Sequence, residues 1–232
     1  MDMAVLMSIV FGGLITIATA LLIEYLRKPK LRITIEHPPL DRTDAAGKHH
    51  VSRHLRLKLR NDVSPLFAPW MQRASAVQCR GAITFHHLND GQDVFDRSMV
   101  VRWANSPEPI TGLGLAGQNA TQIFGLGTSS IQPTFKFSLD SRIDVYAGEE
   151  ELLDVAVRFH GQKECYGWNN ESYLYDWRTP HWKLEPGRYL VKVVVTSSGQ
   201  KCTGVFRLVN DVENLNDFRL IEALPEDRRK VF

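Results

Sequence analysis

The sequence predicts an all-β domain, an antiparallel sandwich of roughly seven to nine strands, preceded by one N-terminal transmembrane helix. The helix prediction depends on an uncharged apolar stretch, Ala4–Ile23. The sandwich prediction depends on apolar and polar residues that alternate with a period of two, and on turn-forming residues between these runs. We expect residues 1–30 to form the helix and a basic linker, residues 31–211 the sandwich, and residues 212–232 a tail with a short helix.

The apolar stretch Ala4–Ile23 reads AVLMSIVFGGLITIATALLI and contains no charged residue. As a helix it would rise about 30 Å, which matches the hydrocarbon core of a bilayer. A cleaved signal peptide, with Ala18-Thr19-Ala20 as its cleavage site, is the alternative, but Met1-Asp2-Met3 lacks the basic residues that such a peptide carries. The sequence therefore favours a span that is kept.

The charges on either side of the stretch predict its orientation. The N-terminal side carries Asp2 and no basic side chain, whereas four cations follow the stretch: Arg27, Lys28, Lys30 and Arg32. By the positive-inside rule we expect a single-pass protein of the cell membrane, with its N-terminus outside and its β domain in the cytoplasm. A β domain anchored at the outer face is the topological alternative.

Small residues recur every four positions along the stretch, at Ser8, Gly12, Thr16 and Ala20. They would form one ridge of a helix, and such a ridge lets two membrane helices approach closely. This pattern is typical of a homo-oligomer that forms through its transmembrane helix. The alternative is that small residues are simply frequent in membrane helices.

Alternation of apolar and polar residues predicts the strands. In one of them, Leu153, Val155, Val157 and Phe159 share the apolar face. The expected strands, in chain order, are Leu31–Ile35, Val51–Asn61, Val77–Phe85, Met99–Trp103, Thr134–Leu139, Ile143–Tyr146, Leu153–Phe159, Tyr189–Val195 and Cys202–Leu208. A barrel is the alternative to a sandwich, because the pattern does not distinguish them.

Turn chemistry and the tail complete the predicted secondary structure. Asn89-Asp90-Gly91 and Ser197-Ser198-Gly199 predict hairpin turns. Helical periodicity is found only near the end, around Leu215–Leu224, and Pro225 would break that helix.

One passage carries a family resemblance. The residues LEPGRYLVKV at 184–193 resemble the L-x-P-G-x-Y-x-V-x-V passage of immunoglobulin-like and fibronectin-type-III-like domains. The segments Leu55–Asn61 and Cys79–Ile83 are similar to early strands of prokaryotic members. The resemblance implies an immunoglobulin-like sandwich in which the Tyr189 hydroxyl bonds back to the backbone at a strand-to-strand corner. It implies no functional residue, because fold does not determine function.

Sequence motifs give no case for catalysis. Gly112–Gly117 matches G-x-G-x-x-G but lacks a βαβ frame, so we interpret Ser106–Ser130 as a long loop suited to a partner contact. His50 and His54 would lie about 13 Å apart on a strand, too far to share a metal ion. We find no nucleophile motif and expect neither an enzyme nor a cofactor. A formal net charge of +2 gives no case for nucleic acid.

A row of cations is the first candidate contact surface. His54, Arg56, Lys58 and Arg60 share one strand face, and with Arg27, Lys28, Lys30 and Arg32 they could contact anionic lipid or another polyanion. The alternative is that the strand cations pair with carboxylates on a neighbouring strand.

A group of aromatic residues is the second candidate surface, a binding surface for a ligand or partner. It consists of Tyr166, Trp168, Tyr173, Tyr175, Trp177 and Trp182. The alternative is a long connection whose rings cap one end of the sandwich.

Two functions follow from these features. The first is a binding or scaffolding module, held at the lipid bilayer, that contacts a protein partner. The alternative is a membrane-tethered ligand sensor or enzyme that uses the Ser106–Ser130 loop and the aromatic segment 166–182. A pocket where that segment, the Gly-rich loop and ionisable residues meet would favour the alternative, and a flat surface there would favour the first function.

Overall fold

The computed structural model describes residues 3–43, 50–63, 73–106, 141–174, 177–211 and 213–232, and the side chains of all of these except 4–6, 8–10, 50 and 174. Three predicted features lie outside the described residues. These are the strand Thr134–Leu139, the Ser106–Ser130 loop after Ser106, and Tyr175.

Among the described residues the strands form two antiparallel sheets, one of seven strands and one of six. The first sheet contains β1 (Leu31–Ile35), β2 (Leu40–Thr43), β3 (His50–Asn61), β6 (Arg102–Trp103), β8 (Glu150–Phe159), β9 (Cys165–Gly167) and β10 (Lys183–Leu184). Its order is β1-β3-β8-β9-β10, with β2 also paired to β3 and β6 to β8.

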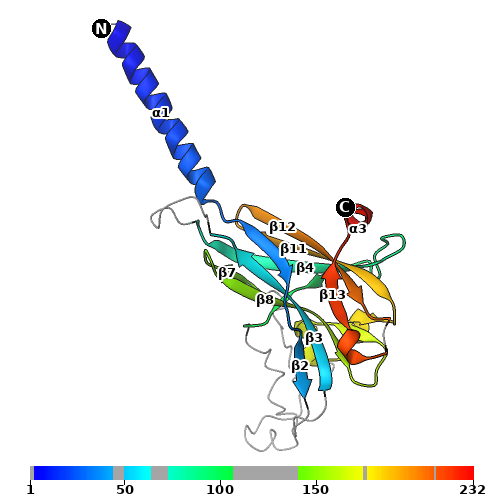
Figure 1. The fold of residues 1–232 in the computed structure, drawn as a ribbon. Coiled ribbons are helices and arrows are strands. Elements are labelled where there is room, and N and C mark those ends of the chain that lie inside the picture. The colour runs from blue at the N-terminus through cyan, green and yellow to red at the C-terminus, as the bar shows by residue number, and fades with distance from the viewer. Residues whose placement is uncertain (1–2, 44–49, 64–72, 107–140, 175–176, 212) are drawn as a thin grey trace, which may run out of the picture.

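The second sheet contains β4 (Ala76–His87), β5 (Met99–Val100), β7 (Ile143–Val145), β11 (Arg188–Ser197), β12 (Gln200–Val209) and β13 (Arg219–Glu222). Its order is β13-β12-β11-β4-β5, with β7 also paired to β4. Figure 1 shows the long strands of both sheets running side by side. The prediction of an antiparallel all-β domain is therefore confirmed.

The two sheets share one main core. Leu57 and Leu59 of β3 belong to the same buried cluster as Phe85 of β4 and Val191 and Val193 of β11. These residues have the period of two that predicted their strands, because alternate side chains of a strand point to the same face. Burial of such apolar side chains is the main favourable term in folding.

The pairing of β3 with β8 contains an extra residue. Leu55 lies opposite Ala156, but the next residue, Arg56, lies opposite Asp154, so Val155 is left without a register partner. An extra residue of this kind is a β-bulge, and it reverses which side chains face inward.

The bulge corrects part of the predicted pattern of β8. Leu153 and Val155 belong to the main core, as predicted, but Val157 and Phe159 pack on the other face, in a second cluster with Trp168. The prediction of one shared apolar face for all four residues was therefore wrong beyond Val155, because the bulge inverts the alternation at that point.

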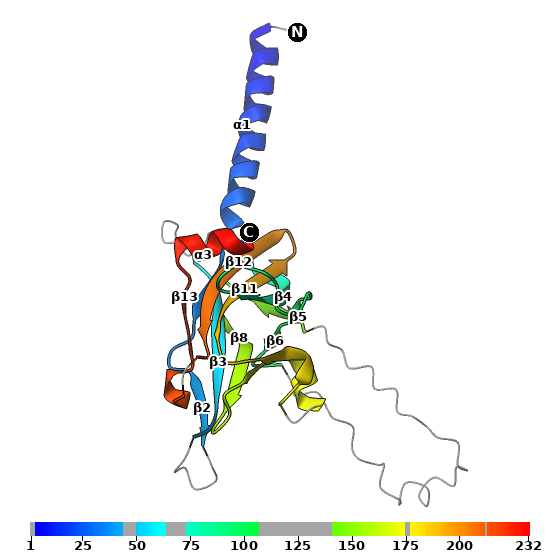
Figure 2. The same cartoon turned by 90° about the vertical axis from the view of Figure 1, so that its right-hand side faces the viewer.

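Helix α1 (Met3–Arg27) has 25 residues and extends away from the two sheets (Figures 1 and 2). Its described apolar side chains, Phe11 and Leu14 among them, are exposed. We found no helix in the described part of the chain that is both long and apolar enough to cross a membrane. The structure confirms the predicted helix and leaves its membrane span a prediction.

Asn61 joins the end of α1 to the domain. Its side-chain oxygen accepts a hydrogen bond from the Lys30 backbone at 3.0 Å, and its amide group donates to Ala74 O at 3.0 Å and Val145 O at 3.2 Å. The asparagine side chain is fully buried, and these three hydrogen bonds give its polar atoms the partners that burial requires.

The tail differs from the prediction of a helix over Leu215–Leu224. That stretch contains a short 3₁₀ helix, η3 (Leu215–Asp217), and strand β13, and helix α3 (Pro225–Val231) begins at the proline. Proline suits the first turn of a helix, where its missing N–H has no intrahelical partner to lose. Asp227 accepts the Leu224 N–H at 3.0 Å and so caps α3.

Helix α3 covers the outer face of the second sheet. Val231 packs with Leu190 and Val205 in a third buried cluster. This contact explains why β11 carries an apolar residue, Leu190, on the face that points away from the main core.

Both predicted turns are present. The register pairs Ser197 with Gln200, so Ser198 and Gly199 form a two-residue turn between β11 and β12, with Gly199 at a φ of +79°. In the turn that contains Asn89, His87 N–H donates to Gln92 O at 2.9 Å.

The corner at Tyr189 has the predicted hydrogen bond. The Tyr189 hydroxyl donates to Glu185 O at 2.8 Å, and the ring lies against Gly187, where an added Cβ would be 3.4 Å from the hydroxyl. The corner is confirmed as a local feature, and the immunoglobulin-like assignment of the whole domain stays a prediction.

Replacement of Tyr189 by Phe tests the corner. We expect Tyr189→Phe to lower the free energy of unfolding by about 1 kcal/mol, because it removes one hydrogen bond and leaves the Glu185 carbonyl without this donor. Urea unfolding measures the change. Tyr146→Phe is the matched control, since Tyr146 is 55% exposed and should lose almost nothing. Equal losses in the two variants would contradict a role for the hydroxyl.

Candidate functional site

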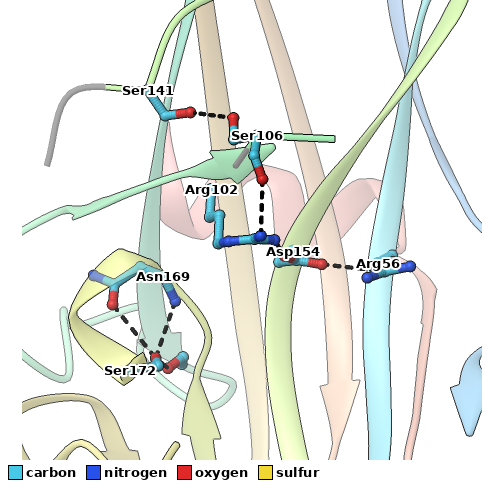
Figure 3. Close-up of polar contacts among 8 residues, drawn as sticks. Arg56, Arg102, Ser106, Ser141, Asp154, Asn169 and Ser172 are labelled. Atoms are coloured by element: carbon cyan, nitrogen blue, oxygen red, sulfur yellow. Dashed lines mark hydrogen bonds and ion pairs between the residues drawn. The ribbon is translucent and has the colours of Figure 1, made fainter. Parts of the chain in front are cut away.

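The aromatic segment leaves the first sheet between β9 and β10 (Figure 2). It contains two short 3₁₀ helices, η1 (Asn170–Leu174) and η2 (Pro180–Trp182). The Ser172 hydroxyl fixes the start of η1, because it accepts a hydrogen bond from the Asn169 N–H at 3.1 Å (Figure 3) and donates to Gly167 O at 3.3 Å.

Three of the predicted aromatic residues gather beside η1. The rings of Trp168 and Trp177 are parallel, with centroids 4.5 Å apart. Tyr173 meets Trp177 edge-on at 4.0 Å and Trp168 at 6.2 Å. The segment is therefore an ordered stack of rings rather than a set of separate surface side chains.

Two other aromatic residues of the segment, Trp182 and Tyr166, are buried in the domain. Trp182 lies in the main core, 5.2 Å from the Phe95 ring, and its indole N–H donates to Glu171 Oε2 at 2.8 Å. Tyr166 is buried and packs 6.5 Å from Phe159. Both rings therefore pack inside the domain, and neither of them lines the pocket described next.

A pocket of about 330 Å³ opens beside the stacked rings. It lies at the end of β2 and the start of β3, which Figures 1 and 2 both place remote from α1. Its lining residues are Arg42, Thr43, Val51, Ser52, His54, Phe159, Trp168, Trp177 and Arg178. Phe159 lines the pocket because the bulge in β8 turns its side chain away from the main core.

Two arginines give the pocket its charge. The Arg42 guanidinium lies 5.8 Å from the Trp177 ring centroid, and that of Arg178 lies 4.0 Å from the Phe159 centroid. None of the described lining residues is Asp or Glu. The neighbouring carboxylate of Asp41 receives two hydrogen bonds from Arg53, at 2.6 and 2.7 Å. Among the described lining residues the formal charges are therefore those of the two arginines.

His54 is a neutral polar group in this wall. Its Nε2 is 3.0 Å from Ser52 Oγ, and its ring meets Trp168 edge-on at 4.4 Å. Burial, followed by the charges of Arg42 and Arg56, lowers the pKa of His54 from 6.5 to about 3. At neutral pH the imidazole is therefore uncharged, and it can donate a hydrogen bond to a ligand or accept one from it.

Trp177 has an unusual backbone conformation. Its φ is +65°, in the left-handed region that bulky residues rarely adopt. Its N–H donates to Ser172 O at 2.8 Å, and its ring is held by the stack with Trp168. Such conformations cost about 1–3 kcal/mol and cluster at functional sites.

The predicted row of cations on β3 is paired with carboxylates. Arg56 Nε lies 2.7 Å from Asp154 Oδ1 (Figure 3), Lys58 Nζ 2.9 Å from Glu150 Oε2, and Arg60 Nη1 3.3 Å from Glu150 Oε1. This arrangement matches the cross-strand alternative, and His54 is buried rather than exposed.

A second arginine completes the pair at Asp154. Arg102 Nη1 donates to Asp154 Oδ2 at 2.7 Å, and Nη2 donates to Ser106 O at 3.1 Å (Figure 3). Arg102 also lies 5.2 Å from the Tyr173 ring centroid, behind the aromatic stack. Arg102 was not among the predicted residues, although a charged residue inside the apolar run Val100–Trp103 was a signal for such a buried pair.

The remaining predicted cations lie near α1. Arg32 is 3.2 Å from Asp62, Lys28 lies 6.0 Å from the Tyr25 ring centroid, and Arg27 and Lys30 are exposed. Their contact with anionic lipid stays a prediction, and none of them lies at the pocket.

The small-residue ridge is partly described. Gly12, Thr16 and Ala20 are exposed, and no described atom beyond the helix lies within 4 Å of a Cβ built on Gly12. Ser8 has its side chain outside the described residues, and self-association stays a prediction.

Comparisons with known proteins give no match, either to a protein-family model, to a curated protein or to a solved structure. The chemistry of the pocket is therefore inferred from its own side chains. Among the described residues, no cluster of three or more His, Cys, Asp or Glu side chains is arranged to hold a metal ion. The arginines, the stacked rings and His54 can instead bind an organic ligand by charge, stacking and hydrogen bonding.

Asp154→Asn tests the buried ion cluster. We expect a loss of about 3–5 kcal/mol in the free energy of unfolding, because the change leaves the buried Arg102 and the half-buried Arg56 without a counter-charge. Urea unfolding measures it. Glu150→Gln, which affects the exposed pairs of Lys58 and Arg60, is the control and should cost much less. A larger loss in the control would contradict the cluster's structural role.

The pH dependence of stability tests the environment of His54. Its pKa is lower in the folded protein than in the unfolded chain, so the unfolded chain binds the proton more tightly and stability falls as pH drops below 6.5. The expected contribution is about 1.4 kcal/mol per pH unit. His54→Gln should remove this slope between pH 6 and 4 in urea unfolding, whereas His160→Gln, at an exposed site, should keep it. An unchanged slope in His54→Gln would show that the imidazole is not buried as described.

Proposed function

We propose that the protein is a membrane-tethered ligand sensor whose immunoglobulin-like sandwich captures a small ligand in the pocket remote from α1. One observation carries this proposal. The pocket brings the Trp168–Trp177 stack together with Arg42, Arg178 and His54 in a concave site. Apolar walls with a few convergent polar groups are typical of ligand sites. A flat surface at this place would have favoured a scaffolding role.

Binding is favoured over catalysis by the chemistry of the Ser52–His54 pair. The two atoms are 3.0 Å apart, the separation expected of a nucleophile and its base. A general base works best when its pKa is near the operating pH, whereas that of His54 is lowered to about 3. The pair is therefore better suited to fixing a ligand by hydrogen bonds than to activating the serine.

Separate observations support the membrane anchor and the immunoglobulin-like fold. Exposed apolar side chains of α1, followed by Arg27, Lys28 and Lys30, support anchoring in a bilayer with the β domain on the cytoplasmic side. The ridge that includes Gly12 and Thr16 supports pairing with a second copy of the chain. The Tyr189 corner and the two antiparallel sheets support the immunoglobulin-like assignment.

Ring-shaped probes test the proposal on the full chain in lipid nanodiscs. Benzoate, benzamide and benzamidine share one flat ring and differ in charge. We expect at least one of them to bind the wild type in an NMR or calorimetric titration, and to bind Trp177→Ala at least about tenfold more weakly because a ring contact is lost. Tyr146→Ala, at an exposed aromatic residue, is the control and should bind as the wild type does. If none of the three binds, or if Trp177→Ala binds unchanged, the pocket is not a ligand site.

A further inference from the structure

Exposed apolar side chains of the β domain gather at one end of it. Among the described residues of 31–211, the large apolar side chains that are exposed are Val51, Val63, Val77 and Tyr146. Val51 lines the pocket. The other three are 51%, 40% and 55% exposed, and we call them the α1-side patch. Single exposed apolar residues are ordinary on a protein surface, so their shared position is the informative observation.

Hydrogen bonds hold this end of the domain against the last turn of α1. Ala74 N–H donates to Arg27 O at 2.6 Å, and Asp62 N–H donates to Lys30 O at 2.9 Å. Only residues 28–30 separate α1 from β1. The domain is therefore bonded directly to α1, which extends away from this end of the two sheets (Figures 1 and 2).

Val63 and Tyr146 lie beside this junction. Val63 follows Asp62 in the chain, and its side chain lies 3.3 Å from a Cβ built on Gly148, two residues after Tyr146. Gly148 N–H also donates to Asn61 O at 2.8 Å. The two patch residues are therefore on neighbouring segments that meet at the α1 end of the domain.

Val77 belongs to the same end through the pairing of β4 with β7. The register pairs Ala76 with Val145, and both of these residues are fully buried. Successive side chains of a strand point to opposite faces, so the next residues, Val77 and Tyr146, point away from the core. Both patch residues are therefore available to a surface outside the domain.

The patch lies at the depth of lipid headgroups in a chain whose α1 spans a bilayer. The apolar stretch ends at Ile23, and Arg27 lies one helical turn further, a rise of about 6 Å. The headgroup region adds about 5–7 Å to each side of the hydrocarbon core. Ala74 is bonded to Arg27, and the Asn61 amide group bonds both Ala74 O and Val145 O, next to Tyr146.

The side chains at this end suit the boundary between lipid and water. Tyrosine is enriched there because its ring is apolar and its hydroxyl can stay hydrated. Arg27 and Lys30 are exposed beside the patch and can contact lipid phosphates. Exposed charges nearby, Glu149 among them, are compatible with this position because the headgroup region is polar.

The position of the patch selects lipid over a protein partner. Exposed apolar patches mark contacts with proteins or with membranes. A bilayer that holds α1 necessarily lies beside the residues bonded to Arg27, whereas a protein at the same place would have to displace lipid. The bilayer is therefore the occupant that the structure favours.

We propose that the α1-side patch lies against the lipid bilayer, with Val63, Val77 and Tyr146 in the headgroup region. The contact holds the domain in one orientation, with the pocket directed away from the membrane. This proposal rests on the membrane anchor in the function proposed above, and it does not depend on ligand binding by the pocket.

Two nitroxide-labelled lipids test the contact by NMR. The sample is the full chain in phosphatidylcholine nanodiscs with one chain per disc, so a second copy cannot cover the patch. A label on the headgroup should broaden the amide signals of Tyr146 and Gly148. It should leave Gly161 sharp, because that residue is close along the chain to Phe159 of the pocket. A label in the acyl chain should broaden Gly13 of α1, which reports insertion.

Variants of the patch separate contact from mere proximity. Tyr146→Asp and Val63→Asp place a charge where an apolar group met lipid, so each should lower the broadening at Gly148 severalfold. Both residues are exposed, so the melting temperature should stay close to that of the wild type. Val51→Asp is the matched control, because Val51 is 46% exposed at the pocket, and it should leave the broadening unchanged.

The outcomes distinguish this proposal from the membrane anchor. If Gly13 is broadened but Gly148 is not, or if both patch variants keep the broadening at Gly148, the patch does not lie against lipid and the anchor stands. If Gly13 is not broadened by the acyl-chain label, the anchor and the proposed contact are both wrong.

Discussion

An extra residue in β8, Val155, determines which side chains of the first sheet face the core and which face outward. Before it, Leu153 points into the main core, and after it Val157 and Phe159 point to the opposite face, where Trp168 packs on them. Bulges commonly redirect side chains in this way beside functional sites. Without the extra residue, Phe159 would point at the other sheet and the pocket would lose a wall.

Several polar side chains near the bulge are buried in the domain. Asp154 is paired with two arginines, and His54 has a lowered pKa that keeps it uncharged. Arg158 turns inward and donates to Gln162 O at 2.9 Å, to Glu213 O at 3.1 Å and to the Asn210 side chain. Pairing, loss of charge and hydrogen bonding to carbonyl groups are three different ways to reduce the cost of burial.

Much of the fold could be predicted from local patterns, but only part of the site could. The period of two identified the long strands, and the passage around Tyr189 identified its corner. The bulge escaped prediction because Val155 and Ala156 are both apolar, so either register fits the pattern. Strands of two or three residues, such as β9 and β10, are too short to show a period. The aromatic part of the pocket was visible in the sequence, whereas Arg42 comes from a distant strand and only the tertiary structure brings it to Trp177.

Strand β3 connects Asn61, which bonds to the linker after α1 at Lys30, with His54 at the pocket. Seven residues of extended chain span about 23 Å, so the strand acts as a rigid spacer. At physiological ionic strength the potential of a charged lipid surface decays within about 8 Å. For a domain anchored by α1, a ligand would thus be captured beyond the thin layer in which charged lipids change the local concentration of ions. The length of one strand would make occupancy insensitive to the lipid composition of the leaflet beneath it.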